Sequence, residues 1–169
     1  MFARAMAMAC ESFLVQLVLR SETETEVLGA QIAEALGPGD MVALAGNLGA
    51  GKTTLARALV RRLLPGEEVP SPTFTLVQIY DAPRFKVWHA DLYRVKARSE
   101  LRELGFDEAL EDGVLLVEWP DRMAEYLPDD RLDVILEVDD GAEERRVKLI
   151  GRGSWASRMK LFARNDRAP

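Results

Sequence analysis

The sequence predicts one α/β domain with a mixed parallel and antiparallel central sheet flanked by helices. Three observations predict this class. Short runs rich in Val, Leu and Ile recur along the chain, amphipathic helical segments separate several of them, and two pairs of runs lie close enough to form hairpins. The expected strands cover residues 13–20, 41–45, 75–80, 85–90, 114–117, 131–138 and 145–150. One expected helix begins at Ser21. The others cover residues 53–64, 98–104, 107–110 and 154–163.

Length and composition are those of one compact globular domain. With 169 residues, 48% of them apolar and 30% charged, the chain can bury its own core and falls outside the disordered and fibrous classes. We expect the domain proper to cover residues 13–152. An N-terminal extension of residues 1–12 precedes it, and a basic helical tail of residues 153–169 follows.

Cysteine and histidine are too few for two kinds of site. Cys10 and His89 are the only residues of their types, so neither an internal disulfide nor a Cys/His zinc site can form. Residues 1–10 make a poor signal peptide, and no segment is long enough to span a membrane. We therefore expect a cytoplasmic protein without a membrane partner.

The first helix has a recognisable start and end. Ser21 and Glu24 have the spacing of a capping box, in which the serine caps the helix and the acid three residues on binds back. Apolar residues continue at helical spacing until Gly37, Pro38 and Gly39 end the segment.

Residues 46–53 carry the clearest chemical signal. Their sequence GNLGAGKT matches the phosphate-binding pattern G-x-x-x-x-G-K-[ST], with a buried strand expected before it and an amphipathic helix after it. An ordinary glycine-rich turn is the alternative, and this context disfavours it. The motif therefore predicts a P-loop NTPase-like domain that binds ATP with Mg²⁺.

Each position of the loop has an expected role. Glycines let successive backbone N–H groups point at phosphate oxygens above the positive end of the following helix. Lys52 is expected at the β- and γ-phosphates, Thr53 at Mg²⁺ and Thr54 at the α-phosphate. The loop residues expected to contact the nucleotide are Leu48, Gly49, Ala50 and Gly51.

Hydrolysis also needs a carboxylate near the metal. Asp91 and Glu118 each follow an expected strand, at the edge where open α/β sheets bind ligands. Each is alternatively an ordinary solvated acid at a strand end, and the choice of main metal ligand between them stays open. Thr73 lies in a Pro-rich loop that is either a γ-phosphate sensor or a plain turn.

Two further side chains have ambiguous roles. His89 alternates with Val87 along a strand, which favours a half-buried core residue over a functional one. Trp119 directly follows Glu118, where it stacks on a ligand or partner or else packs within the domain.

Four motifs read together resemble the bacterial TsaE (YjeE-type) family. They are GNLGAGKTT at residues 46–54, SPTFTLV at residues 71–77, HADLYR at residues 89–94 and EWP at residues 118–120. Their order and spacing match over about residues 21–147. Four motifs in sequence are far more specific than the P-loop alone.

The resemblance implies an ATPase required to form threonylcarbamoyladenosine in tRNA. Such a protein works with the TsaB–TsaD pair, which transfers the threonylcarbamoyl group, and does not perform the transfer itself. The resemblance implies that Thr53 and Glu118 hold Mg²⁺, and that Lys52 and Asp91 support catalysis with Glu118. Further implied nucleotide or partner contacts are Thr25, Thr73, Trp119 and either Arg145 or Arg146.

Other functions and the role of the tail remain open. A small-molecule kinase and a nucleotide-gated binding module with negligible turnover are the alternatives to the ATPase. The net charge of −6 argues against coating nucleic acid by bulk electrostatics, yet residues 145–169 hold eight Lys or Arg against one acid. This basic segment either contacts tRNA or an acidic partner, or pairs with the acidic remainder of its own chain.

Overall fold

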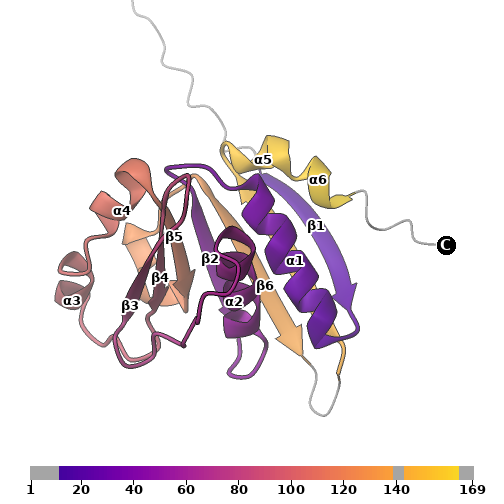
Figure 1. Ribbon diagram of the computed structural model, residues 1–169, viewed down its shortest axis with the longest axis horizontal. Helices are drawn as coiled ribbons and strands as arrows, with labels where there is room; N and C mark the ends of the chain where they lie inside the picture. The colour runs from indigo at the N-terminus through magenta and orange to yellow at the C-terminus, as the bar shows by residue number, and fades with distance from the viewer. Residues whose placement is uncertain (1–11, 139–142, 164–169) are drawn as a thin grey trace, which may run out of the picture.

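The computed structural model describes residues 12–138 and 143–163 and contains one seven-stranded sheet in that part of the chain (Figure 1). The strand order is β1-β7-β6-β2-β5-β4-β3. The strands are β1 Ser12–Leu19, β2 Met41–Gly46, β3 Val77–Asp81, β4 Lys86–Asp91, β5 Val114–Glu118, β6 Arg131–Val138 and β7 Arg145–Arg152.

The sheet is mixed, as predicted. Strands β6, β2, β5 and β4 are parallel neighbours, whereas β1, β7 and β3 pair antiparallel at the two sides. The predicted hairpins are therefore present as β3–β4 and β6–β7. Because the four central strands run the same way, the segments that follow them all leave from one edge of the sheet.

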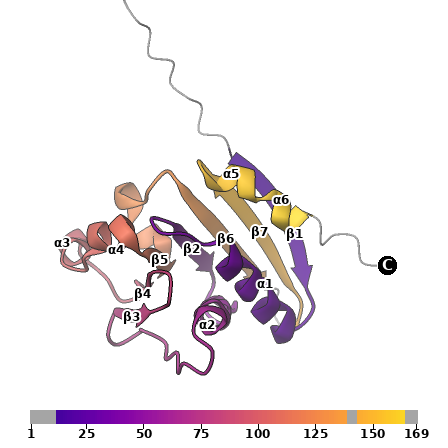
Figure 2. The same cartoon turned by 45° about the horizontal axis from the view of Figure 1, so that its top comes forward.

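Helices cover both faces of the sheet (Figures 1 and 2). Helices α1, α2, α5 and α6 pack on one face, and α3 and α4 on the other. The α-helices are α1 Glu22–Ala35, α2 Lys52–Leu63, α3 Arg98–Arg102, α4 Phe106–Asp112, α5 Trp155–Arg158 and α6 Lys160–Ala163. Two 3₁₀ turns, η1 Pro120–Arg122 and η2 Ala124–Tyr126, follow β5 and were not predicted. No helix in the described part of the chain is long and apolar enough to cross a membrane.

Strand β2 lies at the centre because its sequence is apolar on both faces. Residues 41–44 are all buried, and they alternate between the two hydrophobic clusters that the sheet separates. Helices α1 and α2 approach closely beside it. A Cβ on Gly29 would lie 2.6 Å from the Leu55 carbonyl oxygen, so only glycine permits this distance.

Of the two hydrogen bonds of the predicted capping box at α1, one is present. Ser21 caps the helix and accepts a hydrogen bond from the Glu24 N–H at 3.1 Å. The Glu24 carboxylate does not bind back to Ser21. It accepts instead from the Arg20 N–H at 2.7 Å, one residue earlier. This bond fixes the direction in which β1 enters the helix.

The segment from residue 154 to 163 was predicted as one helix and is two short ones, interrupted at Met159. Trp155, Met159 and Phe162 are buried in the main hydrophobic cluster. Arg158 makes a bidentate contact with the buried Asp40 carboxylate, at 2.5 and 2.9 Å.

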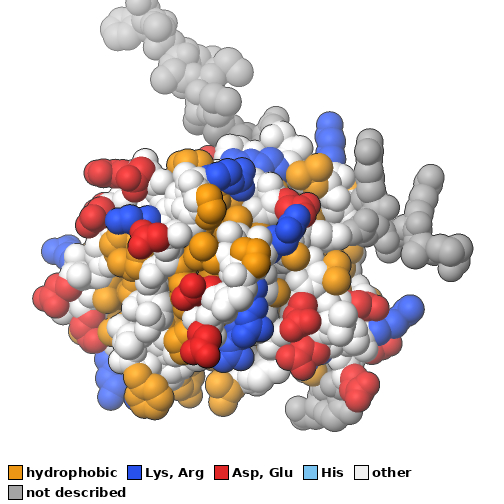
Figure 3. Space-filling model, viewed as in Figure 1, with side chains coloured by type: hydrophobic (Ala, Val, Ile, Leu, Met, Phe, Trp, Pro, Cys, Tyr) orange, Lys and Arg blue, Asp and Glu red, His pale blue; other side chains and the backbone are white. Residues whose placement is uncertain are grey.

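Acidic and basic side chains are interspersed over the face of the molecule seen in Figure 3.

Candidate nucleotide site

The loop between β2 and α2 adopts conformations that favour glycine. Gly46, Gly49 and Gly51 have φ angles of 142°, 80° and 103°, a region that L side chains rarely enter. A Cβ on Gly46 would also lie 2.4 Å from the Leu136 carbonyl oxygen of β6. The spacing of glycines in the motif is therefore a backbone requirement as well as a chemical one.

A cavity of about 380 Å³ lies over this loop. All of the predicted site residues line it except Thr25 and Ala50. Side chains from the ends of β4 and β5 and from the loop around Thr73 complete its walls. The parallel strands thus gather residues distant in sequence around the phosphate-binding motif.

Thr25 lies beneath the loop, Ala50 is a buried residue of the loop itself, and neither lines the cavity. The Thr25 side chain is fully buried and its hydroxyl donates to the Ser21 carbonyl oxygen at 3.3 Å. Its methyl group would lie 3.8 Å from a Cβ on Gly51. The Ala50 N–H donates to the Asn47 carbonyl oxygen at 3.1 Å. Thr25 therefore supports the loop from behind, and the Ala50 bond closes a turn within the loop.

Glu118 reaches the P-loop threonine. The Thr53 hydroxyl lies 2.9 Å from one carboxylate oxygen of Glu118 and 3.2 Å from the other. A hydroxyl beside a carboxylate suits Mg²⁺, which prefers oxygen ligands. Among the described residues, no three His, Cys, Asp or Glu side chains form a metal-binding group. A magnesium ion held here would therefore take its other ligands from phosphate and water.

Asp91 is occupied by its own loop. One of its oxygens accepts a hydrogen bond from the Thr73 hydroxyl at 3.0 Å, and the other accepts from the Tyr93 N–H at 2.9 Å. Asp91 and Glu118 are register partners on neighbouring parallel strands, and both are buried. Neither is the solvated strand-end acid that the sequence left open.

His89 is fully buried, so the expectation of a half-buried residue was wrong. Its strand is covered by β3 and β5 on its two sides and by helices on its faces. The ring nitrogen Nε2 lies 2.9 Å from the Glu118 carboxylate. Alternation along β4 indicated its side of the sheet but carried no information about the acid on the next strand.

Lys52 is buried against the loop and an aromatic ring. Its ammonium group donates to the carbonyl oxygens of Gly46 and Asn47 at 2.7 and 2.8 Å and lies 4.0 Å from the centre of the Trp119 ring. Burial lowers the pKa of Lys52, and the nearby carboxylates of Glu118 and Asp91 oppose this effect only in part.

Trp119 is held in an unusual backbone conformation. Its φ angle is 62°, which costs about 1 to 3 kcal/mol for a residue other than glycine. Its N–H donates to the Leu44 carbonyl oxygen of β2 at 3.1 Å, and its ring lies 4.9 Å from that of Tyr93. Such strain is typical of functional sites, and here it places the indole beside Lys52.

Sequence reasoning missed several residues of the cavity, among them Arg94 and Tyr93, and did not choose between Arg145 and Arg146. Arg145 lines the cavity, and its buried Nε atom has no hydrogen-bond partner among the residues that the structure describes. A Cβ on Gly51 would lie 3.1 Å from that nitrogen. Neighbouring residues of a strand face opposite ways, so Arg146 lies on the other side of β7. Only the register of the hairpin could have told the two apart.

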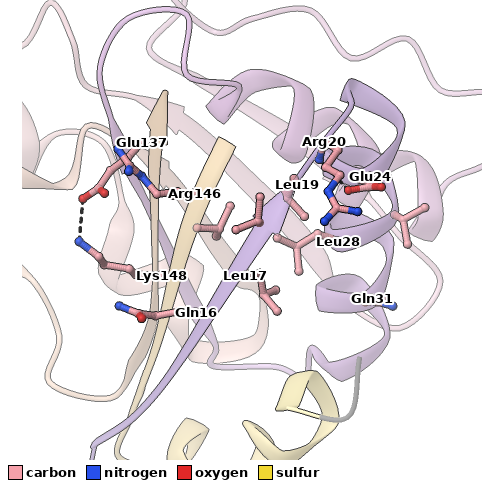
Figure 4. Close-up of a pocket in the computed structure, with 13 residues that line it drawn as sticks. Gln16, Leu17, Leu19, Arg20, Glu24, Leu28, Gln31, Glu137, Arg146 and Lys148 are labelled. Carbon is pink, nitrogen blue, oxygen red and sulfur yellow. Dashed lines mark hydrogen bonds and ion pairs between the residues drawn. The ribbon is translucent and has the colours of Figure 1, made fainter. Parts of the chain in front are cut away.

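A larger hollow, of about 730 Å³, lies away from this loop around the edge strand β1 (Figure 4). Apolar side chains of β1 and α1 line one part of it, and Arg146 lines another beside the ion pair between Lys148 and Glu137. Of the residues that the sequence offered for the site, only Arg146, the alternative to Arg145, borders it. Its size therefore does not make it the nucleotide site, because the phosphate-binding loop is elsewhere.

Comparisons with known proteins agree with these features. A family model described as threonylcarbamoyl adenosine biosynthesis protein TsaE matches residues 19–147. The tRNA threonylcarbamoyladenosine biosynthesis protein TsaE of Rickettsia felis is 42% identical over 143 residues, covering 83% of this chain and 82% of the relative. The protein of the same description from Aquifex aeolicus is 38% identical, covering 82% of this chain and 97% of the relative.

A solved structure has the same architecture. The crystal structure of Bacillus subtilis YdiB superimposes with a TM-score of 0.77 and 28% sequence identity, covering 93% of this chain and 99% of that one. The sequence matches span the P-loop, both buried acids and the strained tryptophan described above. The chain belongs to the TsaE family.

Proposed function

We propose that this chain binds and hydrolyses ATP with Mg²⁺ to support threonylcarbamoyladenosine formation in tRNA. It would act on a TsaB–TsaD-type transferase complex in the cytoplasm and would not transfer the threonylcarbamoyl group itself. The observation that best supports this function is the contact between Thr53 and Glu118 at the N-terminus of α2. P-loop proteins hold the metal of their nucleotide at this position.

The residues divide the work as follows. Backbone N–H groups of the loop and the start of α2 bind the phosphates, and Lys52 supplies a fixed positive charge. Thr53 and Glu118 hold Mg²⁺, which neutralises the charge that develops on the phosphate oxygens. Asp91 and Thr73, already joined by a hydrogen bond, orient the attacking water and sense the γ-phosphate.

The partner contributes the rest of the activity. We infer weak turnover by the isolated chain and stimulation by the TsaB–TsaD complex with tRNA. Contact with tRNA is indirect in this proposal, and three of the eight basic side chains of residues 145–169 pair with acids of the domain. Lys148, Arg152 and Arg158 pair with Glu137, Asp133 and Asp40.

One assay tests the proposal: ATP turnover by the chain alone, then with TsaB–TsaD and tRNA, then with small hydroxyl acceptors. Stimulation by the complex is expected. Phosphorylation of an acceptor would indicate a kinase instead, and binding without turnover under every condition would indicate a nucleotide-gated module. Lys52→Ala should abolish nucleotide binding, whereas Glu118→Ala should retain binding and lose Mg²⁺-dependent hydrolysis. Normal hydrolysis by Glu118→Ala would move the metal role to Asp91.

A further inference from the structure

We propose that His89 is a positioning residue for the metal site: its Nε2–H group holds the Glu118 carboxylate in the orientation that faces Thr53. This inference rests on the proposed function, because it concerns how the same chain would hold the metal of its nucleotide. His89 itself would touch neither the metal nor the nucleotide.

The contact is buried and close. Nε2 of His89 lies 2.9 Å from Oε1 of Glu118, and the side chains are 0% and 2% exposed. The two residues come from adjacent parallel strands, with His89 in register with Leu116, two residues before the acid. Side chains two residues apart on a strand share a face, so the geometry follows from the pairing of β4 with β5.

Glu118 is thereby held from two sides. Oε1 lies 2.9 Å from the imidazole, and Oε2 lies 2.9 Å from the Thr53 hydroxyl. A buried carboxylate is costly unless hydrogen bonds compensate for lost water, and these two side chains supply such bonds. Since a carboxylate only accepts, the imidazole donates from Nε2.

The other ring nitrogen argues against a plain core role. Nδ1 of His89 is buried and has no hydrogen-bond partner among the described residues. An apolar side chain would fill the same space without leaving a polar atom unpaired. The hydrogen bond that it donates to Glu118 therefore explains the histidine here, because that bond requires a donor at this position.

Losing the donor should loosen the carboxylate. Side chains that hydrogen-bond to a metal ligand orient it, and their loss typically weakens metal binding or activity about 10- to 100-fold. The imidazole would thus contribute to metal affinity through Glu118, while the phosphate contacts of the loop stay as they are.

Two variants of equal side-chain length separate this role from packing. His89→Gln keeps an N–H donor at the distance of Nε2, whereas His89→Met has a similar reach and no donor. The probe is Mn²⁺, titrated by electron paramagnetic resonance into the chain with saturating ADP. ADP binding in the presence of EDTA, measured by calorimetry, controls for the fold and for the phosphate contacts.

We expect His89→Met to weaken Mn²⁺ binding at least about 10-fold, and His89→Gln to stay within about 3-fold of the unaltered chain. ADP binding without metal should be unchanged in both. Normal Mn²⁺ binding by His89→Met, equal losses in the two variants, or a parallel loss of metal-free ADP binding would overturn the role. If the unaltered chain binds no Mn²⁺ with ADP, the proposed function itself fails.

Discussion

At the scale of single residues, Lys52 has the most informative electrostatics. Burial lowers its pKa from the ordinary value of 10.5, so the folded chain releases this proton at a lower pH than the unfolded chain does. The charged ammonium group of Lys52 therefore destabilises the folded chain at neutral pH. This destabilisation is relieved as the pH rises from the lowered pKa of the folded chain to the ordinary pKa of the unfolded chain. Burial favours the neutral amine of Lys52, whereas a bound phosphate favours the charged ammonium form.

Nucleotide affinity should therefore fall as pH rises from neutrality toward 10.5, beginning below the range of an exposed lysine. Calorimetric titration of ADP in EDTA across this range measures the decline without metal chemistry. Lys52→Arg serves as the control: its affinity is weaker overall, but it should not show this decline, because arginine stays charged. A decline of the same size in both proteins would assign the effect to another group.

Single residues also show what sequence reasoning reaches and what it misses. The loop was predictable because its motif dictates backbone geometry and chemistry together, which the φ angles of Gly49 and Gly51 reflect. His89 was expected to be half-buried, because the sequence did not show that both sides and both faces of β4 are covered. Its contact with Glu118 becomes visible only once β4 is paired with β5 in register. The same limit left Arg145 and Arg146 undistinguished.

At the scale of elements, the packing of α1 on α2 depends on one small residue. A Cβ on Gly29 would lie 2.6 Å from the Leu55 carbonyl oxygen and 3.0 Å from the Ala58 Cβ. Gly29→Ala should therefore destabilise the chain by about 1 to 3 kcal/mol, although alanine is the better helix former.

Chemical denaturation of Gly29→Ala would measure this loss. Glu26→Ala, at an exposed position on the same helix, is the control and should change stability by less than about 0.5 kcal/mol. A Cβ on Gly29 should push α1 away from α2, which begins at Lys52. The same substitution should therefore also weaken nucleotide binding. An unchanged or higher stability would mean that the helices separate at little cost.

Elements with a regular apolar pattern were predicted within a few residues of their bounds. A short apolar run typical of burial on both faces identified β2, and two nearby apolar runs identified the hairpin of β6 and β7. The two 3₁₀ turns after β5 and the interruption at Met159 lacked such a pattern. Their conformations are set by tertiary contacts, such as the bond between the Trp119 N–H and β2.

At the scale of the whole molecule, the C-terminal helices belong to the core that supports the P-loop strand. Arg158 binds Asp40, which directly precedes β2. Arg158→Met should leave that carboxylate buried and unpaired, lowering stability by about 2 kcal/mol; the 29% exposure of Arg158 keeps the loss below that of a fully buried pair.

Thermal unfolding would check this, with Lys160→Met at an exposed neighbouring position as the control. Asp40→Asn combined with Arg158→Met should recover part of the loss, because it removes the unpaired charge. A full loss in the double variant would point to packing of Arg158 on Trp155 instead, where the guanidinium lies 4.5 Å from the ring centre. Deleting the tail is therefore a poor test of tRNA contact, since it also removes part of the core.

The strand order was beyond sequence reasoning, because pairing between distant segments leaves no local pattern. The pairing of β1 with β7 joins the first described strand to the last. While the ribosome is still making the chain, β1 has no neighbour on which to form, and it must wait until residue 152 has emerged. Every residue up to Arg152 must thus leave the exit tunnel before this sheet can be completed.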